Sequence, residues 1–173
     1  MVPARMLCIA GVALALSLVA VPVAAQTPTT ASVGYQALHW PGAWVPVGVN
    51  FDVAVPRGDA WSVVGEFGIV HDGDDDEFGD TRGFNIFNLG GGIRWGRARA
   101  GVTPFAQVLA GVQISNSDTD TDTAFMLQPG AGVQVPIGDR WAAAAQVDYR
   151  PVFYREEIVN EVRLVVGVRR SFR

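Results

Sequence analysis

The chain has 173 residues, of which 49% are hydrophobic and 17% charged, with 20 glycines, one cysteine and a formal net charge of -4. This length suits one domain rather than two. All the basic residues are arginines, and an acidic chain without a basic stripe argues against binding to nucleic acid.

Residues 1–25 have the pattern of a cleaved signal peptide. Met1–Arg5 is a short basic segment, Met6–Ala20 is apolar, and small residues precede the expected cleavage point. The apolar run is short for a membrane span, which disfavours the alternative of an uncleaved anchor. Cleavage leaves one domain, residues 26–173. It also removes Cys8, so the mature chain has neither a disulfide nor a thiolate ligand for a metal.

Beyond residue 30, polar and apolar residues alternate with a period of two, which predicts strands. We predict eight strands, at residues 33–40, 46–55, 61–71, 84–95, 102–114, 125–135, 141–153 and 162–172. Their lengths are close to the 9–11 residues with which a tilted strand crosses a bilayer. The expected fold class is therefore all-β, an eight-stranded antiparallel up-and-down transmembrane β-barrel.

The predicted connections differ in length between the two rims. Three are tight turns, at residues 57–60, 96–101 and 138–140. Three others are longer and polar, His71–Gly83, Ser115–Ala124 and Tyr154–Glu161, and the short segment Pro41–Val45 lies on the same side as these. Tight turns on one rim and longer loops on the other are typical of outer-membrane barrels.

Alternation alone does not separate a membrane barrel from a soluble lipocalin-like barrel, because the two are inside-out relative to each other. Glycines on the polar faces suit a crowded lumen; they are Gly48, Gly90, Gly92, Gly111, Gly130, Gly132 and Gly167. Aromatic residues mark the strand ends, as in the girdles of membrane barrels. One group is Trp61, Trp95, Trp141 and Phe172, and the other is Trp40, Trp44, Phe125, Phe153 and Tyr154. These features favour a membrane barrel with its polar faces inward.

On these features, residues 30–173 resemble the small eight-stranded outer-membrane β-barrel family of Gram-negative bacteria, the OmpA/OmpX-type or porin-like domains. The closing segment VRLVVGVRRSF resembles the last strand of that family, whose final aromatic residue is read by the outer-membrane assembly machinery. Here Phe172 is followed by Arg173, a departure from the family pattern. The resemblance implies location in the cell outer membrane, with contacts to lipid, lipopolysaccharide and the assembly machinery.

Charged residues on the inward faces form two predicted groups. Asp52, Glu66, Arg94 and Arg169 lie nearer the tight-turn rim, and Asp148, Arg150 and Arg163 lie further along the barrel. We expect these charges to pair and plug the lumen, because side chains fill an eight-stranded barrel and buried charges persist when paired. The alternative is a proton or ion path lined by the same groups.

Two acidic runs lie on the long-loop side. One is Asp72–Glu77 with Asp80, and the other is Asp118, Asp120 and Asp122. Oxygen clusters suit Ca²⁺, but the first run has Glu77 where an EF-hand loop requires glycine. These runs are either solvated, mobile loops or places where divalent cations bridge the protein to lipopolysaccharide phosphates.

The sequence offers weak support for catalysis. A lipid-modifying hydrolase of the outer leaflet would require His39 or His71 beside a serine and an acid, and Ser115 and Ser117 fall in a predicted loop. We therefore assign no catalytic, cofactor-binding or metal-ligating residue. We expect a monomeric, non-enzymatic barrel with a plugged polar lumen and a structural envelope or surface-interaction role. The soluble periplasmic lipocalin-like binder of an apolar ligand remains the other alternative.

Overall fold

The computed structural model of the chain describes residues 28–40, 43–45, 47–75, 81–99, 101–116, 121–155 and 157–172. The predicted signal peptide lies outside the described residues. The strands are β1 (Thr29–Trp40), β2 (Ala43–Val45), β3 (Gly48–Pro56), β4 (Trp61–Asp75), β5 (Thr81–Gly96), β6 (Thr103–Asn116), β7 (Thr121–Pro136), β8 (Trp141–Phe153) and β9 (Ile158–Phe172). Among the described residues, no helix is long and apolar enough to cross a membrane.

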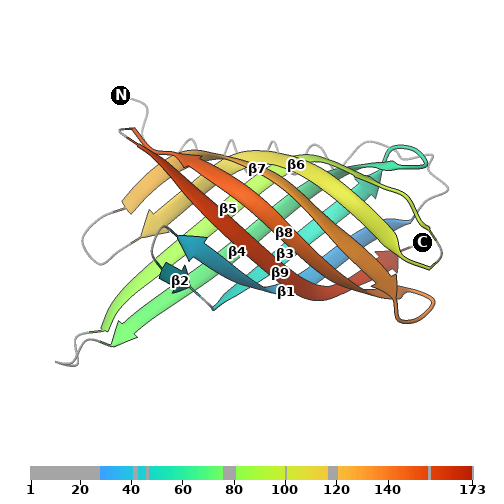
Figure 1. The fold of residues 1–173 in the computed structure, drawn as a ribbon, viewed down its shortest axis with the longest axis horizontal. Coiled ribbons are helices and arrows are strands. Elements are labelled where there is room, and N and C mark those ends of the chain that lie inside the picture. Colours follow the sequence, from blue (N-terminus) through green and yellow to red (C-terminus); the bar gives the residue numbers. More distant parts are fainter. Residues whose placement is uncertain are drawn as a thin grey trace.

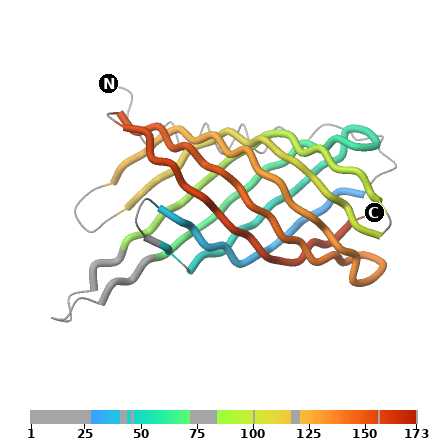
Figure 2. Tube along the Cα trace, in the orientation of Figure 1, coloured from blue at the N-terminus to red at the C-terminus, as the bar shows by residue number. Residues whose placement is uncertain are grey.

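Eight long antiparallel strands close into a barrel. From β1 through β3 to β9, each strand pairs with the next, and β1 also pairs with β9. The closing ladder runs from Thr29 opposite Phe172 to His39 opposite Val162, so the first and last strands lie side by side (Figure 2). The strands cross the barrel at a strong tilt (Figure 1). The predicted fold class is thus confirmed.

The strands extend beyond their predicted ends on the long-loop side. The β4–β5 ladder continues to Asp75 opposite Thr81, and the β6–β7 ladder continues to Asn116 opposite Thr121. The strand ends therefore leave segments of similar length at both rims, and the predicted long loops are wrong. The predicted strands end where the polar and apolar alternation gives way to polar side chains. The ladders continue further, because backbone hydrogen bonds do not depend on side-chain polarity.

The chain after β1 also departs from the prediction. Ala43–Val45 was expected in a short connection, but it folds back as β2 on the end of β1, with Val45 opposite Leu38. The next barrel strand begins at Gly48 rather than at residue 46. The side chain of Val45 is buried against Leu38, Val70 and Ile86 at this end of the lumen.

Each barrel strand presents one face to the lumen and one to the outside. In β3, exposed and buried residues alternate from Gly48 to Pro56. The large exposed hydrophobic side chains come from every barrel strand; examples are Val33, Phe51, Phe67, Ile93, Val108, Leu127, Val147 and Val166. The apolar faces therefore point outward and the charged faces inward, which contradicts the soluble lipocalin-like alternative.

One ladder of the barrel wall is interrupted where two prolines lie. The β7–β8 ladder pairs Met126 with Val152 and resumes with Gly130 opposite Asp148. Within this unpaired stretch, Pro129 and Pro151 occupy positions of the same hydrogen-bonding type on the two strands. Because proline has no N–H group, each removes one donor from the ladder.

Candidate functional site: the charged lumen

The described lumen holds four carboxylates and four guanidinium groups. All are buried; they are Asp52, Glu66, Asp148, Glu161, Arg94, Arg150, Arg163 and Arg169. Seven of them were predicted to face inward. Glu161 was missed, because it was placed at the end of a predicted loop, whereas it lies within β9.

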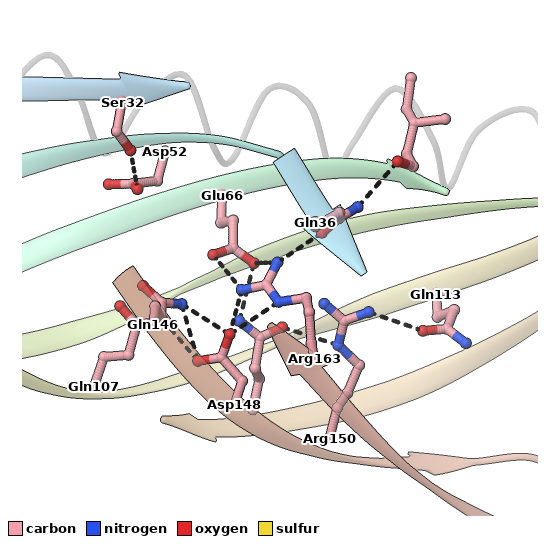
Figure 3. A network of polar contacts seen from close by, with 12 residues as sticks. Ser32, Gln36, Asp52, Glu66, Gln107, Gln113, Gln146, Asp148, Arg150 and Arg163 are labelled. Carbon is pink, nitrogen blue, oxygen red and sulfur yellow. Dashed lines mark hydrogen bonds and ion pairs between the residues drawn. The ribbon is translucent and has the colours of Figure 1, made fainter. Parts of the chain in front are cut away.

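Arg163 lies at the centre of the network, between two carboxylates (Figure 3). Its Nη1 is 2.8 Å from Glu66 Oε1, and its Nη2 is 2.6 Å from Asp148 Oδ2. Gln36 accepts a further hydrogen bond from Nη1 at 3.2 Å. Gln146 donates to both oxygens of Asp148, at 2.9 and 2.8 Å. These contacts join β1, β4, β8 and β9 across the lumen, whereas the backbone ladders join each strand only to its neighbours.

A second set lies nearer the tight turns. Asp52 is 3.1 Å from Arg94 Nη1 and 3.2 Å from Arg169 Nη2, and it accepts a hydrogen bond from Ser32. Both guanidinium groups also lie over the ring of Phe105, with Cζ-to-centroid distances of 4.7 Å for Arg94 and 5.6 Å for Arg169. Cation–π contacts of this kind add to the ion pairs in a desolvated site.

The third set lies toward the other end of the barrel. Arg150 Nη1 is 3.7 Å from Glu161 Oε2, and Arg150 Nε donates to Gln128 Oε1 at 3.0 Å. Glu161 Oε1 accepts hydrogen bonds from Trp40 Nε1 at 2.6 Å and from Gln113 Nε2 at 2.8 Å. Two charge-assisted hydrogen bonds and one longer ion pair therefore hold this carboxylate, both of these hydrogen bonds being to Oε1.

The predicted plug is confirmed, but one predicted grouping is wrong. Glu66 was placed with Asp52, its cross-strand neighbour in the β3–β4 ladder. In the structure Glu66 instead pairs with Arg163 of β9. The stagger of strands around a barrel shifts their relative depths, so positions counted from the turns do not give partners across the lumen.

Glutamines connect the sets along the barrel axis. Gln107 accepts from Arg94 at 2.9 and 2.6 Å and donates to Asp148 at 3.4 Å. Gln128 donates to Glu66 at 2.9 Å and accepts from Arg150. With four charges of each sign, the described lumen is neutral overall and densely hydrogen-bonded. This arrangement favours pairing over the predicted alternative of an ion path.

The two ends of the lumen differ. Toward the β2 end, buried Leu38, Val45, Val70 and Ile86 pack together with Trp40 and Phe84. Toward the tight turns, a cavity of about 160 Å³ lies between Arg94, Arg169 and the 58–60 turn. The lumen is thus closed by an apolar cluster at one end and hollowed at the other.

The predicted aromatic girdles are confirmed in part. At the tight-turn rim, Trp61, Trp95, Trp141 and Phe172 are all exposed on the outer face. At the other rim, Trp44, Phe125 and Phe153 are exposed, and the last two rings are 5.9 Å apart. Trp40 and Tyr154, in contrast, point inward, where Trp40 binds Glu161 and Tyr154 lies 3.0 Å from Ser115. Trp40 Nε1 and the Tyr154 hydroxyl form polar contacts in the lumen. The position of these two residues at strand ends did not reveal that they point inward.

The histidines considered for hydrolysis lie in other surroundings. His39 packs edge-on against Trp44, with ring centroids 4.8 Å apart. His71 is exposed, and its Nδ1 lies 2.9 Å from Asn85 Oδ1. The contacts described for the two imidazoles are with an indole ring and an amide oxygen, not with a serine hydroxyl or a carboxylate. A nucleophile held by its base is the geometry that a hydrolase requires.

The predicted cation sites lie largely outside what the structure describes. Asp80, Asp118 and Asp120 are not among the described residues, and only the backbone is described for Asp72–Asp75. In the described part of the chain, no group of three or more histidine, cysteine or acidic residues is placed to hold a metal ion.

Solved outer-membrane barrels share this fold. Neisserial surface protein A superposes with a TM-score of 0.69 at 12% identity, covering 87% of this chain and 100% of that one. Ail, the attachment invasion locus protein of Yersinia pestis, gives 0.57 at 16% identity over 86% of this chain and 100% of its own. OprG from Pseudomonas aeruginosa gives 0.60 at 7% identity over 84% and 96%.

At these identities the likeness shows the fold: the chain has the architecture of the small outer-membrane barrels. No family model matches the chain, and no curated protein sequence matches it.

Proposed function

We propose that the mature chain is an integral outer-membrane barrel with a plugged polar lumen, serving a structural or surface-interaction role in the envelope. The observation behind the proposal is where the side chains point: apolar side chains cover the outside of every barrel strand, and the eight buried charged side chains of the described residues point into the lumen. This arrangement is stable in a bilayer, whose hydrocarbon covers the apolar belt, whereas in water the belt would be exposed. The expected signal peptide supplies the export route.

The resemblance adds partners to this proposal. Phe172 near the chain end is the feature that the assembly machinery would read. Ail has been solved in complex with the heparin analogue sucrose octasulfate. A polyanion of that kind suits the rim opposite the tight turns poorly, because the sequence predicts the acidic runs 72–77 and 118–122 there. Divalent cations bridging these runs to lipopolysaccharide phosphates fit the charge better.

A matched pair of arginine substitutions tests the membrane assignment. Val166 lies mid-strand on the outer face and is 63% exposed, and Ile137 lies beside a tight turn and is 62% exposed. In lipid vesicles, Val166→Arg should lower the free energy of unfolding by about 2–4 kcal/mol and Ile137→Arg by about 0–1 kcal/mol, because the cost depends on depth. Urea unfolding followed by tryptophan fluorescence measures both.

The same preparation gives a second readout. The folded wild-type barrel should need detergent for solubility and should migrate differently on a gel before and after boiling. A protein that is soluble without detergent, shows no gel shift and tolerates both arginines equally would overturn the proposal. That result would favour a soluble protein that binds an apolar ligand.

A further inference from the structure

The set of charges nearest the tight turns has a local surplus of positive charge. Asp52 is the one carboxylate that contacts Arg94 and Arg169 in the described structure, and both arginines are only 4% exposed. The balancing negative charge lies in the central set, where Arg163 faces two carboxylates. The neutral side chain of Gln107 lies between the two sets and hydrogen-bonds to both. The two arginines therefore share one counter-charge in a desolvated place, which is unfavourable without a further anion.

These arginines line the hollow end of the lumen. The cavity of about 160 Å³ has room for several water molecules. Its charged lining consists of Arg94, Arg169 and the exposed Asp59 of the turn. Thr30, Ser62, Thr103 and Gln134 add polar groups. Among the described atoms, Arg169 Nε is buried and has no hydrogen-bond partner.

The surroundings of the cavity favour negative ligands. Exposed arginines crowd the tight-turn rim; they are Arg57, Arg97, Arg99, Arg140 and Arg170. The described acids at this rim are Asp59 and Asp139. A basic rim around a low-dielectric recess raises the local concentration of anions. Because the apolar cluster closes the opposite end, the approach is from the tight-turn side.

We propose that this cavity is a binding site for a small soluble oxyanion, a carboxylate or phosphate group held by Arg94 and Arg169. Guanidinium groups bind such anions through paired, charge-assisted hydrogen bonds. The anion supplies the counter-charge that Asp52 alone does not, and Phe105 holds both guanidinium planes in place. The site goes beyond the envelope role and does not depend on it.

Titration of the folded barrel tests the site. The protein is prepared in a phosphate-free, non-ionic detergent, and inorganic phosphate or acetate is added at constant ionic strength. Saturable shifts are expected in the NMR amide signals of Ser62, Thr103 and Gln134. Arg169→Gln should weaken binding at least tenfold, whereas Arg140→Gln, which removes the same charge from the exposed rim, should change it less than threefold.

Gln134→Phe keeps both arginines but fills the cavity, so it should abolish binding. It provides the test if Arg169→Gln does not fold. Saturation by either anion, lost in these variants, supports the site. Linear shifts with both anions, or equal weakening by Arg140→Gln, would overturn it. The gel shift on boiling is recorded for every sample, so loss of the site is distinguished from loss of the barrel.

Discussion

Removing Arg163 should destabilise the barrel more than any change on its surface. The side chain is fully buried and forms ion pairs of 2.8 Å to Glu66 and 2.6 Å to Asp148. Replacement by glutamine leaves two buried carboxylates without their cation. Breaking one buried ion pair costs about 3–5 kcal/mol, and we expect at least this loss for Arg163→Gln. The equilibrium between folded and unfolded protein would shift by about two to four powers of ten.

Equilibrium unfolding by urea in lipid vesicles, followed by tryptophan fluorescence, measures this loss. Two further variants separate charge from packing. The triple variant Glu66→Gln, Asp148→Asn, Arg163→Gln has the same shortened side chain at position 163 but no unpaired carboxylate, and it should recover more than half of the loss. Arg140→Gln at the exposed rim should change stability by less than about 0.5 kcal/mol. A loss below about 1 kcal/mol for Arg163→Gln, or a triple variant no more stable than the single one, would refute the reasoning.

Two further predictions concern the wall of the barrel. A Cβ at Gly130 would overlap Asp148 Oδ1, whereas a Cβ at Gly65 would meet no atom within 4 Å. Gly130→Ala should therefore cost about 1–3 kcal/mol and Gly65→Ala should be neutral or slightly stabilising in the same urea assay; equal effects would contradict the crowding argument. Replacing Pro129 and Pro151 together by valine should restore two donors to the β7–β8 ladder and slow amide hydrogen exchange there. Unchanged exchange would show that the prolines are not the cause of the interruption.

The alternation of side chains made the faces of the barrel predictable. A strand has a period of two, so one apolar face and one polar face follow directly from the order of residues. The inward position of Asp52, Arg94, Asp148 and Arg163 was predictable on this basis, and the structure buries all four. The outward aromatic positions of Trp141 and Phe172 were predictable for the same reason.

Contacts across the lumen were not predictable from the same pattern. The partner of Glu66 depends on the accumulated stagger of the strands between β4 and β9, and alternation carries no information on stagger. Glu161 was missed because polar residues around it resembled a loop, although the β8–β9 ladder pairs it with Arg150. The cavity between Arg94 and Arg169 depends on side-chain packing at the barrel mouth, which has no sequence signature of its own.

The central ion pairs have a consequence for the order of folding. Arg163 and Glu66 are 97 positions apart in the chain, and Arg169 and Asp52 are 117 apart. Neither pair forms within a hairpin; both require β9 to reach the strands near the beginning of the chain. A partly assembled sheet would hold unpaired charges against the hydrocarbon of a bilayer, which is costly. We therefore expect closure of the β1–β9 ladder and neutralisation of the lumen to occur in one cooperative step, without a populated half-open intermediate in the membrane.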